Sequence, residues 1–337
     1  MKKRNQMLQF IFSAVILSVL LIDTNTATTG VRDGIEMCLK VIIPSLFPFF
    51  VITTYLNSIL VGCKIPGIRY LTNWLRIPDG GASILLLGLT GGYPIGAKLI
   101  NDLYETKEID KQTAHILLGY CNNAGPSFIF GVSSVAFPSH IVPFTLWFIH
   151  IISAVITGLL LPKPNCKEIY VHQAARVSLA QAIRNSISAC ISVCGWVIVF
   201  KVLLSYLYTW FHTLMKSQFG ILVTGFLELS NGCISAAQIP DPEIRFIFFT
   251  VFFACGGLCV LLQTVSVTST LGTGLYIHGK IIQTGVSFLL ACVCSKILFL
   301  SSQTSITMMI VMLLSVVAIA FTLRRVNNYG NRIENHV

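Results

Sequence analysis

Three groups of residues in this sequence are suited to chemistry, and each interrupts an otherwise apolar stretch. One interruption lies in HILLGYCNNAGPSFIFGV, where Asn122, Asn123, Gly125, Pro126 and Ser127 follow one another closely. Pro126 removes a backbone donor, so free carbonyls and two side-chain amides would collect near the middle of a membrane. Polar groups without partners are costly there. The pattern favours a binding site for a small polar solute or ion, and the alternative is a packing kink whose amides satisfy a neighbouring backbone.

A second group of residues lies just upstream, in SILLLGLTGGYPIGAKLI. Its glycines and Pro94 are too dense for a straight helix. Each arm has about eight residues, or about 12 Å at the helical rise, and reaches only the membrane midplane. We therefore expect a re-entrant hairpin over 82–100, whose tip of Gly91, Gly92, Tyr93 and Pro94 joins the Asn122 region in one site.

A third group occurs in FGILVTGFLELSNGCISAAQIP, which we interpret as a second re-entrant hairpin over 219–237. Glu228, Ser230 and Asn231 lie at its turn. An ionisable residue in a membrane segment is a functional hypothesis by default, and the alternative is a hairpin tip that reaches water. Lys201 is the best-placed charged partner for Glu228, unless its long side chain extends to the membrane surface instead.

The elements that must position these groups are transmembrane helices. The chain has 337 residues, 54% hydrophobic and 11% charged, whereas soluble domains carry about 25% charged residues. A spanning helix needs about 20 mainly apolar residues. Eight segments approach this requirement: 7–22, 38–62, 112–136, 141–161, 185–211, 244–267, 280–300 and 304–323. The fold class predicted is an all-α membrane protein with about eight transmembrane helices plus two re-entrant helical hairpins.

Charge placement predicts the topology. Cytoplasmic loops are enriched in Lys and Arg, and the strongly basic loops fall on one side when both termini are cytoplasmic, with residues 23–30 and the loops FPSHIVP and IPDPE outside. The loop TSTLGTGLYIHGK fits least well, because it lies inside with only Lys280. This arrangement predicts an inverted repeat, the plan of many secondary transporters.

The same reading divides the chain into four parts. Residues 1–30 form an N-terminal transmembrane helix, 31–165 a first repeat, 166–300 a second repeat, and 301–337 a C-terminal helix with a basic tail. The first helix could also be read as a signal peptide, but we expect it to stay uncleaved because the rest of the chain is polytopic.

Other function classes receive no support from the sequence. The net charge of +10 is placed between apolar runs and at the termini, which suits a membrane surface and argues against nucleic acid as a partner. We identify no nucleophile elbow, P-loop, H-E-x-x-H or dinucleotide motif. His115, His150 and His278 have no second ligand at helical spacing, and the cysteines form no C-x-x-C pair. We therefore expect no enzyme activity, catalytic residue, metal or cofactor.

The stretches IIPSLFPFFV (42–51), GLTGGYPIGAKLI (88–100) and GYCNNAGPSFIFG (119–131) resemble the YlbJ-type sporulation integral membrane proteins. That family is grouped with nucleoside-recognition, or Gate, domains, and the resemblance covers about residues 34–300. Gate domains are similar to the cores of concentrative nucleoside transporters and to the gate regions of ferrous iron transporters. In nucleoside carriers the solute binds between hairpin tips and broken helices. The resemblance implies that residues 91–94, 122–127 and 228–232 hold the solute here, although the second hairpin departs more from the pattern.

The resemblance further implies a multi-pass cell-membrane protein of endospore-forming bacteria that is needed for spore formation. The name of the group is not substrate evidence. We expect a transporter or permease for a small polar solute, with the lipid bilayer as its surroundings. A non-transporting scaffold for sporulation proteins is the alternative. The solute, the coupling ion, the direction of transport and any association with itself or with other sporulation membrane proteins are left open.

Overall fold

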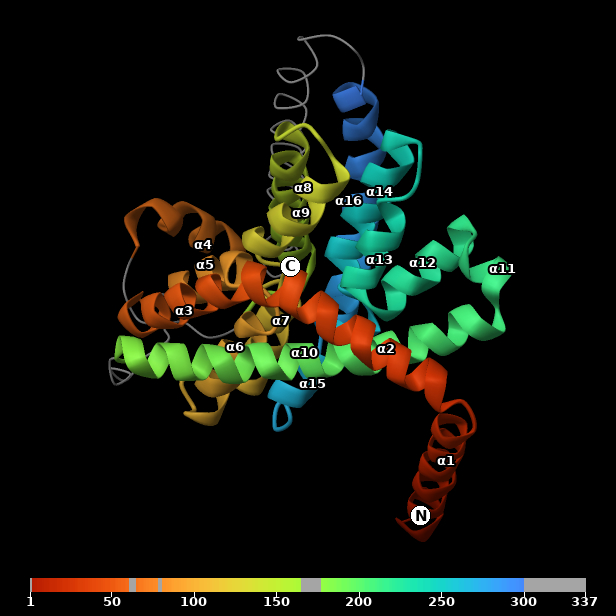
Figure 1. The fold of residues 1–337 in the computed structure, drawn as a ribbon. Coiled ribbons are helices and arrows are strands. Elements are labelled where there is room, and N and C mark those ends of the chain that lie inside the picture. Colours follow the sequence, from red (N-terminus) through yellow and green to blue (C-terminus); the bar gives the residue numbers. More distant parts are fainter. Residues whose placement is uncertain (1, 61–64, 78–80, 165–176, 300–337) are drawn as a thin grey trace, which may run out of the picture.

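The protein is built from helices throughout residues 2–60, 65–77, 81–164 and 177–299, which the computed structural model describes (Figure 1). No strand occurs in these ranges, so the all-α prediction is confirmed for them. The expected helix at 304–323, the basic tail and most of the basic loop before residue 177 lie outside the described residues. The helices of the first half are α1 (Lys2–Ile22), α2 (Thr24–Met37), α3 (Ile43–Leu60), α4 (Arg69–Leu75), α5 (Ala82–Thr90), α6 (Ile95–Glu105), α7 (Lys111–Leu118), α8 (Pro126–Ala136) and α9 (Ile141–Leu160). Those of the second half are α10 (Leu179–Trp210), α11 (His212–Met215), α12 (Gln218–Leu227), α13 (Leu229–Ala236), α14 (Pro242–Cys255), α15 (Gly257–Val267) and α16 (Tyr276–Phe299).

Five helical segments within the described residues are long and apolar enough to cross a membrane: Thr24–Leu60, Ile141–Leu160, Leu179–Trp210, Pro242–Val267 and Tyr276–Phe299. They correspond to five of the eight segments expected from the sequence. Of the other three, α1 is a shorter apolar helix, the segment 112–136 is divided between α7 and α8, and 304–323 is not described. The chain is therefore a multi-pass membrane protein, and the count of eight stays a prediction.

The first long segment corrects the expectation of a loop at residues 23–30. Asp23 caps α2 by accepting a hydrogen bond from the backbone N–H of Thr26 at 3.0 Å, so the chain turns at one residue and continues as helix. Gly30 and Gly34 then bring α2 close to α10, because a Cβ at Gly30 would lie 2.9 Å from the Cα of Val202. Small residues four apart permit such close packing in membranes. The polar residues of this segment thus form a helix–helix contact.

A turn of π-helix over Cys38–Ile42 joins α2 to α3. It lies directly before Pro44, whose ring cannot fit against the carbonyl one turn earlier in a regular α-helix. Pro48 follows inside α3. In Figure 1, α2, α3 and α10 run crosswise to α9, α14 and α16.

The two predicted hairpins are helix–break–helix units in the structure. The arms α5 and α6 flank residues 91–94, and the arms α12 and α13 flank Glu228. Each unit is followed by a broken helix, first α7 and α8 and then α14 and α15. The second of these breaks, at Gly256 and Gly257, corrects the continuous helix expected over 244–267; both glycines adopt positive φ angles of 74° and 77°. The order of elements is thus the same in both halves, whereas re-entrance and inversion across a membrane stay predictions.

Polar contacts join the loops at one end of the helices. The Arg245 guanidinium donates to the carbonyls of Ala136 at 2.7 Å and Ile239 at 2.9 Å, and it lies 5.6 Å from the centre of the Phe137 ring. These contacts place the loops FPSHIVP and IPDPE side by side. Charge placement assigns both loops to one side of the membrane, in agreement with this contact.

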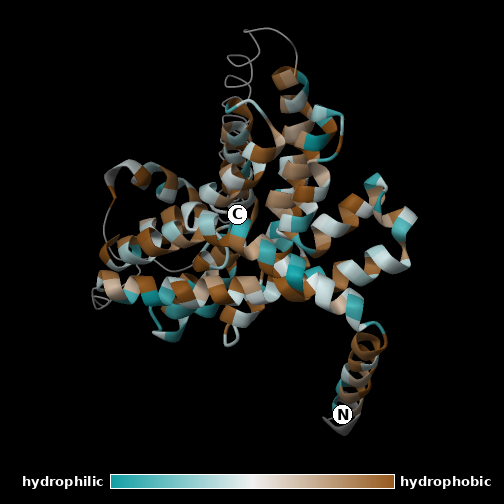
Figure 2. Ribbon diagram, viewed as in Figure 1, coloured by the Kyte–Doolittle hydropathy of each residue, from teal (hydrophilic) through white to brown (hydrophobic). Residues whose placement is uncertain are grey.

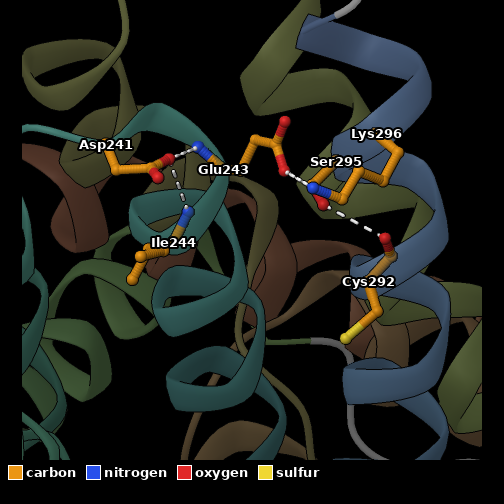
Figure 3. A network of polar contacts seen from close by, with 6 residues as sticks. All are labelled: Asp241, Glu243, Ile244, Cys292, Ser295 and Lys296. Carbon is orange, nitrogen blue, oxygen red and sulfur yellow. Dashed lines mark hydrogen bonds and ion pairs between the residues drawn. The ribbon is translucent and has the colours of Figure 1, made fainter.

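The same region contains an ion pair between α14 and α16 (Figure 3). Asp241 caps α14 by accepting from the backbone N–H groups of Glu243 at 2.8 Å and Ile244 at 3.2 Å. The carboxylate of Glu243 then pairs with Lys296 at 2.5 Å.

At the opposite end, the Thr270 hydroxyl donates to Glu105 at 2.9 Å. This contact brings the loop after α15 to the end of α6.

Large apolar side chains cover much of the outer surface of the described helices. Phe10 is 74% exposed, Ile191 67% and Leu289 66%. Figure 2 shows hydrophobic residues along the helices, α1 among them. Large exposed apolar patches on a soluble protein would cause association, whereas lipid tails can cover such side chains. The polar groups described next are, by contrast, enclosed within the helices.

Candidate functional site

The tip of the first hairpin lies against the polar interruption after α7. Gly92 has a φ of 81° and touches Gly125, since a Cβ on Gly125 would lie 3.1 Å from the Gly92 Cα. On the two arms, a Cβ at Gly88 or Gly96 would overlap the carbonyl oxygen of Cys121. The glycines are therefore required so that this backbone can pass between the arms. The expected meeting of the two segments is what the structure shows.

Asn122 connects the interruption after α7 to the first hairpin and to α15, which follows the break at Gly256 and Gly257. Its side-chain oxygen accepts from the backbone N–H of Ala97 at 3.3 Å, in the first turn of α6, and its side-chain nitrogen donates to Thr264 on α15 at 3.0 Å. The first turn of a helix leaves backbone N–H groups without intrahelical partners. Pro94 caps α6 without a side-chain hydrogen bond, so Asn122 supplies an acceptor from another segment. This contact of Asn122 agrees with the alternative given above, in which the side-chain amides satisfy a neighbouring backbone.

Asn123 lies at the centre of a second set of contacts. Its side-chain nitrogen donates to the carbonyls of Tyr120 at 2.7 Å and Gly88 at 3.1 Å. Its side-chain oxygen accepts from Gln283 at 3.0 Å and from Lys280 at 3.3 Å. Both donors come from α16. The amide of Asn123 therefore joins the hairpin to a helix 160 residues further along the chain.

Lys280 is the residue that the sequence reading placed wrongly. It belongs to α16 and is 6% exposed, rather than marking a loop at the membrane surface. Its Nζ donates to the Gln283 side chain at 2.8 Å, to the Tyr93 hydroxyl at 2.9 Å and to Asn123, and it lies 5.0 Å from the centre of the Tyr93 ring. A lysine amino group has three donors, and all three are used. The sequence signal was the pair Lys280 and Gln283, three residues apart in an apolar helix.

His150, on α9, also belongs to this cluster. Its Nε2 accepts a hydrogen bond from the backbone N–H of Ala124 at 3.1 Å, and its backbone carbonyl accepts from Gln283 at 3.4 Å. The residue is 1% exposed. Four segments thus meet around Asn123: the first hairpin, the interruption, α9 and α16.

Glu228 occupies the break of the second hairpin and is 2% exposed. Its carboxylate accepts from the backbone N–H of Ser230 at 3.0 Å, and from the backbone and side-chain nitrogens of Asn231, both at 2.7 Å. All three donors are neutral, and by accepting from the two backbone N–H groups the carboxylate caps the N-terminus of α13. Lys201 is partly exposed and makes no ion pair with Glu228, so of the two alternatives for Lys201 the pairing is wrong. The alternative for Glu228, a hairpin tip that reaches water, does not fit this structure either, because the residue is buried.

A small cavity, here called the site cavity, lies between the two hairpins. Tyr93 and Gly125 line it from the first half, and Glu228, Ser230 and Gln263 from the second. Its apolar walls come from Ile42, Leu46, Phe128, Val193, Val197 and Val260, among others. The volume is about 40 Å³, far below the roughly 300–1,000 Å³ of ordinary ligand pockets. The site cavity therefore holds water-sized groups in this conformation.

The structure thus separates the predicted site residues into three groups. Tyr93, Gly125, Glu228 and Ser230 line the site cavity. Asn122 and Asn123 hold the surrounding backbone and helices by hydrogen bonds, and Asn231 donates to the Glu228 carboxylate. The remaining residues shape turns or start helices and do not line the cavity: Gly91, Gly92, Pro94, Pro126 and Ser127.

Lys280 also borders a separate groove of about 360 Å³ between α12, α15 and α16. Phe226, Leu258 and Ile281 give this groove mainly apolar walls. Tyr93 lies between the two spaces, since its side chain lines the site cavity and its hydroxyl accepts from Lys280.

Comparison with known proteins gives one informative similarity. The chain is 33% identical over 114 residues to the sporulation integral membrane protein YlbJ of Bacillus subtilis (strain 168). The match covers 32% of this chain and 26% of that protein, so the chain spans about a quarter of the length of the relative it matches. No family model matches the chain, and no solved structure does. The similarity supports a YlbJ-like membrane protein.

Proposed function

We propose that this protein is a permease for a small polar solute, acting in the membranes of spore-forming cells. The site cavity is the observation that carries the proposal. It lies where the first hairpin tip, the interruption after α7 and the second hairpin meet, and both halves of the chain contribute polar groups to it. Irregular backbone at membrane depth is tolerated where protein or a wet cavity surrounds it. Sites of secondary transporters are built in this way, from discontinuous helices at a repeat interface.

The small volume of the site cavity fits a closed conformation. In the proposed cycle the two hairpins move against the long helices α3 and α10 to admit solute from one side at a time. Tyr93, Glu228 and Gln263 offer a hydroxyl, a carboxylate and an amide to the solute. The setting in sporulation rests on the similarity to YlbJ, whose printed name describes a sporulation integral membrane protein. Cytoplasmic termini and the inverted repeat belong to the same proposal.

Uptake into proteoliposomes tests this function. Purified protein is assayed against a panel of nucleosides, small metabolites and metal ions, as wild type and as Asn122→Ala and Glu228→Gln. Asn73→Ala and Glu36→Gln are matched controls, because both residues are exposed in the structure. We expect at least one solute to enter with wild type and both controls, and uptake to fall about tenfold or more in each site variant, which corresponds to about 1.4 kcal/mol.

Transport and scaffolding lead to different results. If the folded wild-type protein moves no member of the panel, and cells with either site variant still sporulate normally, the permease proposal is rejected. That pair of results would favour the membrane scaffold. If the controls lose uptake as strongly as the site variants, the site cavity is not the place of binding.

A further inference from the structure

A third space, larger than the site cavity, is lined in part by the same two long helices and is here called the outer chamber. It has a volume of about 260 Å³ between α3, α6 and α10. Its polar walls include Asn57, Lys98, Asp102, Thr106, Glu108 and Asn185. Lys98, Asp102 and Thr106 are exposed. The outer chamber is therefore a space with side chains of both charges in its walls, and it reaches the surface near the end of α6.

The two cavities lie along the same faces of the two long helices. Ile42, the last residue of the π-helical turn, and Leu46 on α3 line the site cavity. The following positions of α3 at the same spacing, Phe50 and Thr54, line the outer chamber. Residues four apart lie on one face of a helix. The π-helical turn ends at Ile42, so this face begins where the regular helix resumes.

The facing helix repeats the pattern. On α10, Val193 and Val197 line the site cavity, whereas Asn185 and Ala189 line the outer chamber. These four positions are again spaced by four residues. One continuous strip of each long helix thus leads from the outer chamber to the site cavity.

Phe50 stands at the junction of the two cavities. Its side chain is fully buried and lines the outer chamber. A Cβ on Gly92 would lie 3.9 Å from the Phe50 ring, and Gly92 in turn touches Gly125, which lines the site cavity. The aromatic ring therefore fills the space between α3 and the first hairpin tip.

We propose that the outer chamber is the aqueous vestibule of the site cavity and that the Phe50 ring closes the passage between them. The inference rests on the proposed permease function and adds the route by which a small polar solute reaches the site. The solute enters beside α6, passes along the strips of α3 and α10, and reaches the site cavity when the hairpin tip and the ring separate.

Cysteine labelling tests the route without requiring transport. Ala189→Cys reports on the outer chamber and Val193→Cys on the site cavity, each in purified protein treated with a water-soluble cationic methanethiosulfonate. We expect Ala189→Cys to react readily and Val193→Cys slowly. Adding Phe50→Ala should speed modification of Val193→Cys by about tenfold or more, because removal of a buried ring leaves a cavity. The rate at Ala189→Cys should change much less, because the outer chamber already reaches the surface.

Phe49→Ala is the matched control, since Phe49 is the adjacent residue of α3 and is 44% exposed. Variants without an introduced cysteine measure the background from native thiols such as Cys190. Phe50→Leu covers the case in which the alanine variant misfolds, and it should change the rate in the same direction by less. The proposal is overturned if Ala189→Cys is unreactive, or if Phe50→Ala and Phe50→Leu accelerate Val193→Cys no more than Phe49→Ala does. Because the readout is chemical modification, failure of uptake leaves this result intact.

Discussion

Replacement of Lys280 by methionine tests the central polar cluster. The Nζ of Lys280 donates to Gln283, Tyr93 and Asn123 at 2.8, 2.9 and 3.3 Å. Two of these acceptors keep another partner: Asn123 accepts from Gln283 at 3.0 Å, and the Tyr93 hydroxyl donates to the carbonyl of Phe253 at 3.4 Å. Only the Gln283 oxygen is left without a donor. One unsatisfied buried acceptor costs about 1–3 kcal/mol, while loss of a buried amino group removes its desolvation cost. We therefore expect Lys280→Met to lower the free energy of unfolding by no more than about 3 kcal/mol.

A double-mutant cycle sharpens the test. Gln283→Leu alone leaves Lys280 with one unpaired buried donor, again a cost of about 1–3 kcal/mol. The double variant removes both the Gln283 oxygen and the Lys280 amino group, and it leaves only the side-chain oxygen of Asn123 without a donor. The double variant should therefore lose about as much stability as one single variant does. Its loss is then about 1–3 kcal/mol smaller than the sum of the two single losses, and this difference is the coupling energy. Additive losses within about 0.5 kcal/mol would refute the reasoning.

The assay is reversible unfolding in mixed micelles, followed by tryptophan fluorescence during a titration with sodium dodecyl sulfate. Lys296→Met is the control on the same helix, because the Lys296 side chain is 71% exposed in its ion pair with Glu243. Exposed pairs contribute about 0–1 kcal/mol. A control loss as large as that of Lys280→Met would show that charge on α16, and not the buried cluster, determines the effect.

Two further predictions concern contacts that hold the site in place. Gly96→Ala should destabilise the protein by about 1–3 kcal/mol or prevent folding, because its Cβ would overlap the Cys121 carbonyl. The control is Gly195→Ala, which has open space around its Cβ and should be neutral or stabilising by up to about 1 kcal/mol in the same titration. Equal effects of the two variants would contradict the close backbone crossing at Gly96. Arg245→Ala should cost about 1.5–3 kcal/mol through its lost hydrogen bond to the Ala136 carbonyl, with faster hydrogen exchange in the adjoining loops; unchanged exchange there would show that this contact does not join them.

Local sequence patterns predicted the breaks at 91–94 and 228 correctly. Glycine and proline act on the backbone of their own segment, so a dense group of them ends a helix wherever the segment is placed. The sequence does not predict the break at Gly256 and Gly257, because the flanking residues are strongly apolar. The polar residues of 23–30 have the opposite effect, since Asp23, Asn25 and the threonines are typical of a loop. Only the packing of Gly30 and Gly34 against α10 shows that they belong to a helix.

The sequence by itself determined that this is an all-helical membrane protein with polar interruptions, and it singled out Tyr93 and Asn123 as candidates. Only the tertiary structure decided which groups meet those residues. Lys280 lies 187 positions from Tyr93, and nothing local distinguishes a lysine at a membrane surface from one enclosed by hydroxyl and amide groups. Likewise the hydrogen-bond donors to Glu228 are backbone N–H groups in the first turn of α13, and Lys201 is not among them. Helix breaks depend on neighbouring residues, whereas the partners of a buried charge depend on how distant helices pack.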